Sequence, residues 1–212
     1  MQYDTLMDVL GLLDHRQRAV FEACRDVGPL WRMAADDSHS YTASRLYAEK
    51  EPQDALRMSC RDGELTTARW LSDHFGLTAE DARADDNCAL RWACSGGHLE
   101  VARWLTDCFG LTAEDARAGD NYALQWACLG GHLGVARWLA DRFGLTAADA
   151  RAGDNCALQW ACRGGHLEVA RWLVDRFSLT AEDARSCNLE LQRACGGAHS
   201  EVTRWLADRF GV

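Results

Sequence analysis

Cysteine and histidine recur as pairs along this chain, always with three residues between them. The pairs are Cys94 and His98, Cys128 and His132, Cys162 and His166, and Cys195 and His199. Zinc prefers thiolate and imidazole ligands, but a zinc site needs three or four of them at about 2.0–2.3 Å. Each pair supplies only two ligands. Because stacked helix layers lie roughly 8–10 Å apart, neighbouring pairs cannot easily bind one ion together. We therefore expect buried cysteines, histidines that bond to backbone at a turn, no metal and no cofactor.

The same residues do not favour catalysis. A nucleophilic site needs one arrangement of nucleophile, base and orienting group in a pocket. Here cysteine, histidine and aspartate recur in parallel along the chain, which is typical of a structural role. We predict that the protein is not an enzyme and has no catalytic residue.

An internal repeat sets the spacing of these pairs. The segment ALQWACRGGHLEVARWL at 157–173 closely matches ALQWACLGGHLGVARWL at 123–139. Tryptophan marks each unit at Trp70, Trp104, Trp138, Trp172 and Trp205, in steps of 34, 34, 34 and 33. Such self-similarity is the signature of a repeat architecture, in which units stack along one axis.

Each unit predicts two helices. A short first helix begins after Asp120–Asn121, which are good N-cap residues, and ends at the glycine pair 130–131. A longer second helix runs from His132 to Gly144 and is apolar except for one narrow polar stripe. Because both flanks of the helix pair are apolar, we expect each unit to pack on a copy above and a copy below.

The linker between units predicts a further short helix. Its Thr112 and Asp115 form a T-x-x-D variant of the capping box. No segment alternates with a period of two residues for long enough to make a strand. We therefore predict an all-α solenoid of stacked helix pairs, joined by linkers that each contain a linker helix.

The repeated motif resembles that of the ankyrin repeat family. GGHLEVARWL at 96–105 and 164–173 is similar to the family's GHLEVVKLLL signature, and ALQWAC stands where the family has PLHxAA. The resemblance covers residues 53–212, as five repeats. The family's T-P-L-H opening is replaced by Cys-Ala-Leu-Arg at 88–91, and its hairpin by GLTAEDAR, which favours the linker helix over an extended finger.

This resemblance implies a scaffold that binds a protein partner of unknown identity on the concave face of the solenoid. Three implied contact positions differ between otherwise duplicated units, namely Ser95, Leu129 and Arg163. The others lie in the linkers: Asp85, Asn87, Asp120, Asn121, Asp154 and Asn155. A second aromatic column, Trp92, Trp126 and Trp160, is expected to pack between repeats and to be partly exposed.

Both ends of the array depart from the repeat. Arg193, Ser200 and Thr203 make one flank polar, so residues 186–212 are predicted to be a C-terminal cap. Residues 1–52 are expected to form an irregular helical N-terminal cap, for which two interpretations stay open. One is a degenerate repeat. The other is an F-box, because residues 6–34 loosely resemble that family; this would make the protein an adaptor that docks on a Skp-type subunit of a ubiquitin ligase.

Charge and hydropathy narrow the class of partner. With 23 Lys+Arg against 32 Asp+Glu, the net charge of −9 disfavours nucleic acid, whose binding depends on neutralising phosphates. No apolar run approaches the length of a membrane span, and the N-terminus lacks the features of a secretory signal. We expect an intracellular, most simply cytoplasmic, protein whose ten cysteines are thiols.

Overall fold

The structure is a computed structural model that describes residues 51–185 and 200–211. Every regular element in these residues is an α-helix, and the residues from Pro52 onward belong to one compact unit. The predicted all-α solenoid of stacked helix pairs is therefore confirmed. This part of the chain contains no helix that is both long and apolar enough to cross a bilayer.

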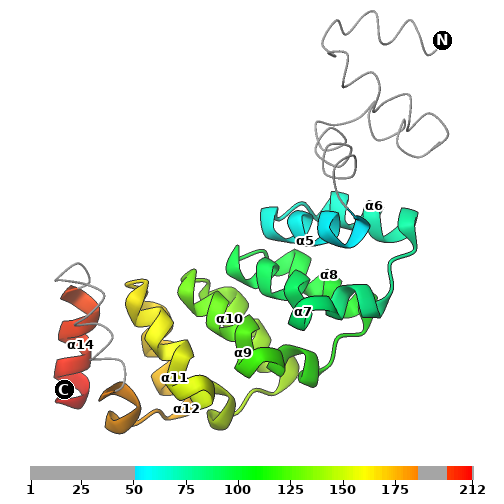
Figure 1. Cartoon of the computed structure of the whole chain (residues 1–212). Coiled ribbons are helices and arrows are strands. Elements are labelled where there is room, and N and C mark those ends of the chain that lie inside the picture. The colour runs from blue at the N-terminus through cyan, green and yellow to red at the C-terminus, as the bar shows by residue number, and fades with distance from the viewer. Residues whose placement is uncertain (1–50, 186–199, 212) are drawn as a thin grey trace, which may run out of the picture. The chain divides into compact units, whose positions relative to one another are not determined.

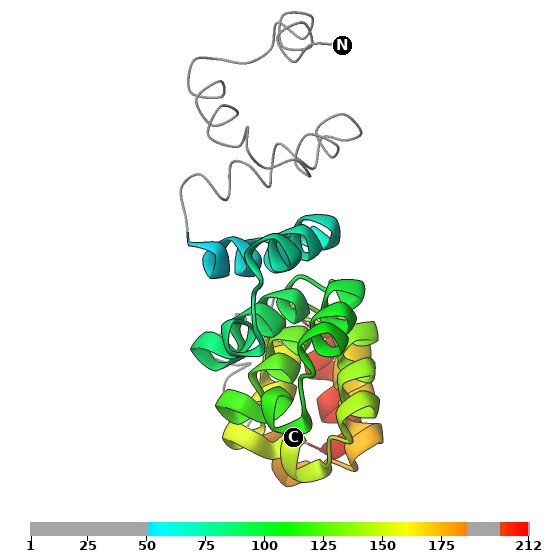
Figure 2. The ribbon, with the colours of Figure 1, turned by 90° about the vertical axis from the view of Figure 1, so that its right-hand side faces the viewer.

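The helices form two rows (Figures 1 and 2). One row holds the first helices: α5 (Pro52–Asp62), α7 (Ala79–Ser95), α9 (Ala113–Leu129) and α11 (Ala147–Arg163). The other holds the second helices: α6 (Leu65–Phe75), α8 (Leu99–Phe109), α10 (Leu133–Phe143), α12 (Leu167–Phe177) and α14 (Ser200–Phe210). From α5 to α12, each helix packs against its own partner and against its neighbours in its row, and α14 packs against α12.

The predicted linker helix is present and is continuous with the first helix across a kink. In α9, Thr112 and Asp115 form the expected capping box, and the backbone leaves helical geometry at Ala118. The next three residues, 119–121, have positive φ angles of 60°, 56° and 67° before the first helix starts. The same left-handed turn occupies residues 85–87 and 153–155. Glycine, aspartate and asparagine fill these turns because they adopt this conformation at the lowest cost.

Small and large apolar residues divide between the two rows. The first helices bury alanines together with one leucine, such as Ala123, Ala127 and Leu124 in α9. The second helices bury larger side chains, such as Leu139 and Phe143 in α10. Alanine lets helix axes approach closely, so the first helices pack more tightly against one another than the second helices do.

The tryptophans of the second helices lie at the margin of this core. Trp104, Trp138 and Trp172 are partly buried and pack against it, each edge-on to the phenylalanine five residues later. Trp70 of α6 is more deeply buried, with 9% of its surface exposed. These tryptophans contribute to packing, although in these three units the fully buried centre of the second helix is leucine.

Only part of each predicted cap falls on described residues. In α14, Val202 and Leu206 are buried and Thr203 is exposed. Arg193 lies outside the described residues, and so do residues 1–50, on which both interpretations of the N-terminal segment rest.

Candidate protein-binding face

The histidine of each pair joins one unit to the preceding unit. His98, His132 and His166 each donate from Nε2 to a backbone carbonyl oxygen 2.9 Å away, that of Arg61, Ser95 and Leu129 respectively. The predicted bond from histidine to backbone is therefore confirmed, and the structure adds that it crosses between units. Each of these bonds occupies Nε2 of the ring, which leaves Nδ1 as the ring nitrogen that could bind a metal ion.

Cys94, Cys128 and Cys162 of the pairs are buried in the core, and so is Cys60 at the equivalent position of the first described unit. Cys60, Cys94 and Cys128 are fully buried, and burial raises the pKa of each thiol far above its ordinary value, so the thiols are protonated. Within residues 51–185 and 200–211, no group of three or more histidine, cysteine, aspartate and glutamate side chains could hold a metal ion.

Space for each histidine ring comes from the glycine pair. A Cβ atom at Gly97 would lie 2.5 Å from Nδ1 of His132 in the next unit, and one at Gly130 would lie 2.5 Å from Cδ2 of the same ring. Gly97 also has a φ angle of +74°, which other residues adopt only at a cost. The motif Gly-Gly-His therefore works as one joint that spans two units.

A second joint lies at the opposite end of the first helices, where the linker helices meet. Arg117 donates from Nε to Asp149 Oδ1 at 2.7 Å and from a terminal nitrogen to Oδ2 at 3.3 Å. Asp149 also accepts the backbone N–H of Thr146 at 2.7 Å, so one carboxylate closes the capping box and holds the preceding unit. Arg83 with Asp115 and Arg151 with Asp183 repeat this geometry.

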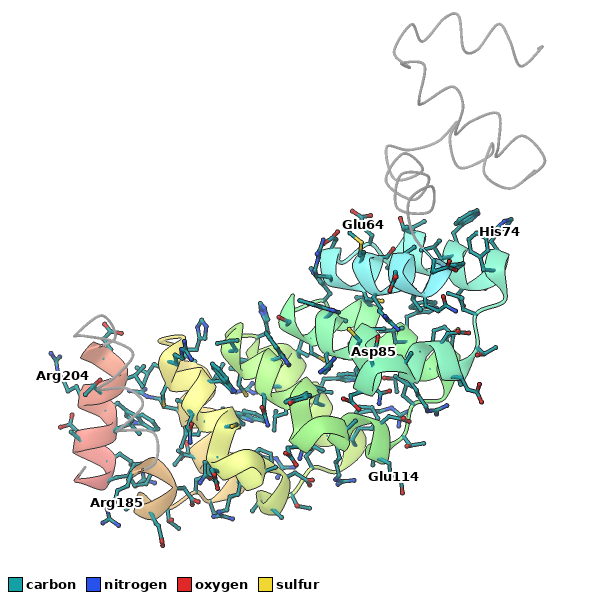
Figure 3. The ribbon with its side chains drawn as sticks, in the orientation of Figure 1. Glu64, His74, Asp85, Glu114, Arg185 and Arg204 are labelled. Carbon is teal, nitrogen blue, oxygen red and sulfur yellow. The ribbon has the colours of Figure 1, made fainter. Side chains whose placement is uncertain are left out.

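The predicted contact residues in the left-handed turns fall into two groups according to the exposure of their side chains. Asp85, Asp120 and Asp154 are exposed, so they remain candidates for contact with a partner; Asp85 is labelled in Figure 3 at the kink of α7. Asn87 and Asn121 are only 5% exposed, so their side chains offer little surface to a partner, and Asn155 is half-buried.

The asparagines also fail to form the predicted cap. Each directly precedes a first helix, but Oδ1 of Asn87, Asn121 and Asn155 is buried and accepts no hydrogen bond within the described part of the chain. Their positive φ explains this, because an N-cap normally has an extended backbone. Gln125 and Gln159 instead hold the turns, each donating from Nε2 to an aspartate carbonyl oxygen at 2.6 Å.

Exposed aromatic side chains gather on the row of first helices. Trp92, Tyr122 and Trp126 are the exposed large hydrophobic residues of the described chain, at 38%, 37% and 37%. The rings of Trp92 and Trp126 lie 6.2 Å apart between centroids, tilted by 38°. The predicted partial exposure of this column is confirmed for Trp92 and Trp126; Trp160 is half-buried.

Two arginines lie over aromatic rings on the same face. The guanidinium of Arg91 lies 5.2 Å from the centroid of Tyr122 and donates to Asp85 O at 2.9 Å, while that of Arg163 lies 5.0 Å from Trp160. A depression of about 360 Å³ opens between the units and is lined by Arg91, Tyr122, Gln125, Trp126, Leu129 and Trp160. We call these residues, with Trp92 and Arg163, the aromatic face.

Of the three predicted positions that vary between units, two belong to this face. Leu129 lines the depression and Arg163 is exposed beside it, whereas Ser95 is half-buried and its carbonyl serves the histidine joint. Tyr122 is not among the contact residues predicted from the sequence; it replaces a cysteine at that position of the neighbouring units. The available signal was a bulky aromatic residue at a position where the neighbouring units have cysteine.

The described helices include a segment that matches a known family. Residues 108–185 match the family model of ankyrin repeats in three copies. Comparison with curated proteins finds no match to the chain. Ankyrin repeats indicate a protein–protein interaction module, and the family is generally non-enzymatic.

Proposed function

We propose that the ankyrin solenoid is a non-enzymatic scaffold that binds a protein partner through the aromatic face. The observation that carries this is the position of Trp92, Tyr122 and Trp126, the exposed large hydrophobic residues of the described chain, on adjacent units of one row. Aromatic side chains exposed together are costly in water and are enriched at the centres of interfaces.

The form of the face suits an interface. A depression of about 360 Å³ can take an apolar side chain, and the arginine over Trp160 adds a cation that is already ordered. Tryptophan, tyrosine and arginine are the residues that dominate binding energy in interfaces. The two joints between units hold the first helices in register, so little conformational entropy is lost when a partner docks.

Selection from a displayed peptide library tests the proposal. The full chain is immobilised, and enriched peptides are then measured against Trp126→Ser and against Arg137→Ala, which alters an exposed residue of α10 in the other row. We expect peptides that bind the wild type and Arg137→Ala equally but lose affinity by about tenfold or more with Trp126→Ser. Peptides that are indifferent to Trp126 would overturn the proposal.

The adaptor alternative concerns residues 6–34, which lie outside the described residues. It requires the solenoid to hold a target while the N-terminal segment docks on a Skp-type subunit. A pull-down with that subunit, using the full chain and a chain lacking residues 1–37, tests it. Recovery of the full chain alone would support the adaptor, and failure to recover the full chain would remove it.

A further inference from the structure

A column of unpaired carboxylates borders the aromatic face. Its members occupy the same place in three left-handed turns, six residues before the tryptophan of the same unit: Asp86, Asp120 and Asp154. All three side chains are exposed, and no cation of the described chain forms an ion pair with them. Each unit therefore presents one free carboxylate near one aromatic ring.

In the first of these turns, at residues 85–87, an arginine of the preceding unit pairs with an aspartate. Arg57 of α5 reaches across to the next unit and pairs with Asp85 at 2.6 Å. In the following units the arginine position becomes Arg91 and then Gln125, while the aspartate position becomes glycine. Among residues 51–185 and 200–211, this ion pair is thus confined to the first of the three turns, and no cation of these residues pairs with the adjacent column of carboxylates.

The arginines of the aromatic face do not neutralise this column. Arg91 donates to a backbone carbonyl and lies over Tyr122, and Arg163 lies over Trp160. Both are held by rings or backbone, so a ligand meets a strip of aromatic rings with acidic side chains along one border. Cationic side chains with aliphatic stems complement both parts of this strip, since the stem packs on a ring and the head pairs with a carboxylate.

The spacing of the units indicates the conformation of such a ligand. Adjacent first helices pack directly, so successive carboxylates lie roughly 8–10 Å apart along the row. A polyproline II chain has three residues per turn and advances about 3.1 Å per residue, or about 9 Å per three residues. Every third side chain of a polyproline II peptide would therefore lie on the side that faces the carboxylates and could meet an equivalent carboxylate in the next unit.

We infer that the partner is a basic protein segment that binds in the polyproline II conformation, with arginine or lysine at every third position paired to Asp86, Asp120 and Asp154. The intervening side chains pack on Trp92, Trp126 and the depression beside Leu129. This inference rests on the proposed function and adds the charge, conformation and register of the segment that is bound.

Fluorescence anisotropy with labelled synthetic peptides and the full chain tests this. The probe is a peptide of about twelve residues with arginine at every third position and alanine and proline between, measured at about 0.15 M salt. One comparison peptide has the same composition with its arginines contiguous, and another has glutamate in place of arginine. The probe is expected to bind, and to bind more tightly than either.

Two matched triple variants distinguish the effect of these three carboxylates from the effect of the net charge of the protein. Asp86→Asn, Asp120→Asn and Asp154→Asn together are expected to weaken binding of the probe about tenfold. The control triple, Asp107→Asn, Asp141→Asn and Asp175→Asn, removes the same charge at the same interval from exposed positions of the second helices. It is expected to change affinity less than about twofold.

Three outcomes would overturn the inference: no binding of the probe, equal loss in both triples, or affinity that ignores the spacing or sign of the charges. The selection from a peptide library distinguishes failure of this inference from failure of the proposed function. Selected peptides that depend on Trp126 but carry no basic residues would leave the binding face in place and remove the basic ligand.

Discussion

His132 donates from Nε2 to the carbonyl oxygen of Ser95, 2.9 Å away, across the boundary between two helical units. The bond satisfies a carbonyl at the end of α7 and fixes the distance between neighbouring glycine pairs. Equivalent bonds made by His98 and His166 show that the arrangement belongs to the repeat and not to one boundary. Stability should therefore depend on these joints as well as on the apolar core.

Gly97→Ala is expected to destabilise the chain by about 2 kcal/mol or more. The new Cβ would overlap the ring of His132, and the backbone at this position has a positive φ. Gly134→Ala is the control, because a Cβ there meets no atom within 4 Å and alanine favours the helix by about 0.5–1 kcal/mol. Urea unfolding followed by circular dichroism measures both. Equal effects of the two substitutions would contradict the joint.

Leu139→Ala is expected to cost about 2–5 kcal/mol in the free energy of unfolding, because this side chain is fully buried in the middle of the array. Trp138→Ala should cost less, about 1–3 kcal/mol, since the neighbouring tryptophan is only partly buried. Chemical denaturation of the two variants compares them directly. A larger loss for Trp138→Ala would show that the tryptophan, and not the leucine, is the centre of the layer.

Acid is expected to weaken the second joint. For Asp149, burial acts to raise the pKa, but the hydrogen bond from Arg117, those from Thr146 and the arginine's charge outweigh it, so the pKa of Asp149 is lowered. The same balance lowers the pKa of Asp115 and Asp183. A carboxyl group whose pKa is lower in the folded than in the unfolded state stabilises the fold at pH values above its unfolded pKa. This contribution is lost as the pH falls through the folded pKa.

The measurement is the free energy of unfolding as a function of pH between about 6 and 2. Asp115→Asn, Asp149→Asn and Asp183→Asn together should reduce the acid dependence of stability. The control is the Asp107, Asp141 and Asp175 triple, in which none of the substituted carboxyls takes part in these joints. A pH profile unchanged by the first triple would contradict the role of the joint.

Thiol reactivity is expected to divide the cysteines by burial. Cys108 is exposed, whereas Cys60, Cys94 and Cys128 are buried with a raised pKa, which removes both access and thiolate. Brief alkylation of the native protein followed by mass spectrometry should modify Cys108 and leave those three untouched. Alkylation of all four cysteines at similar rates in the folded protein would show that Cys60, Cys94 and Cys128 are not buried in the core.

Much of the fold could be predicted from the sequence because the repeat supplies the same information several times. The period fixed the register of the helices, and a T-x-x-D pattern at Thr112 marked the linker helix that the structure contains. Capping and glycine signals act within a few residues, so a single sequence suffices to read them.

The contacts between units could not be predicted from the sequence. Nothing in the local pattern shows that His132 bonds to the unit before it, or that Arg117 reaches an aspartate 32 residues later. The turn at Asn121 was misread for a related reason. Asparagine favours both N-caps and left-handed backbone, and only the path of the chain between linker helix and first helix decides between them.

Both joints have a direction, with a carbonyl and an arginine on the preceding unit and a histidine and an aspartate on the following one. Any inner unit therefore carries one half of each joint on either side and is interchangeable with its neighbours. Duplication of one 34-residue stretch within the gene would recreate every contact at the new boundary. The array can in this way lengthen by whole units, and each added unit would extend the aromatic face by one more ring and one more carboxylate.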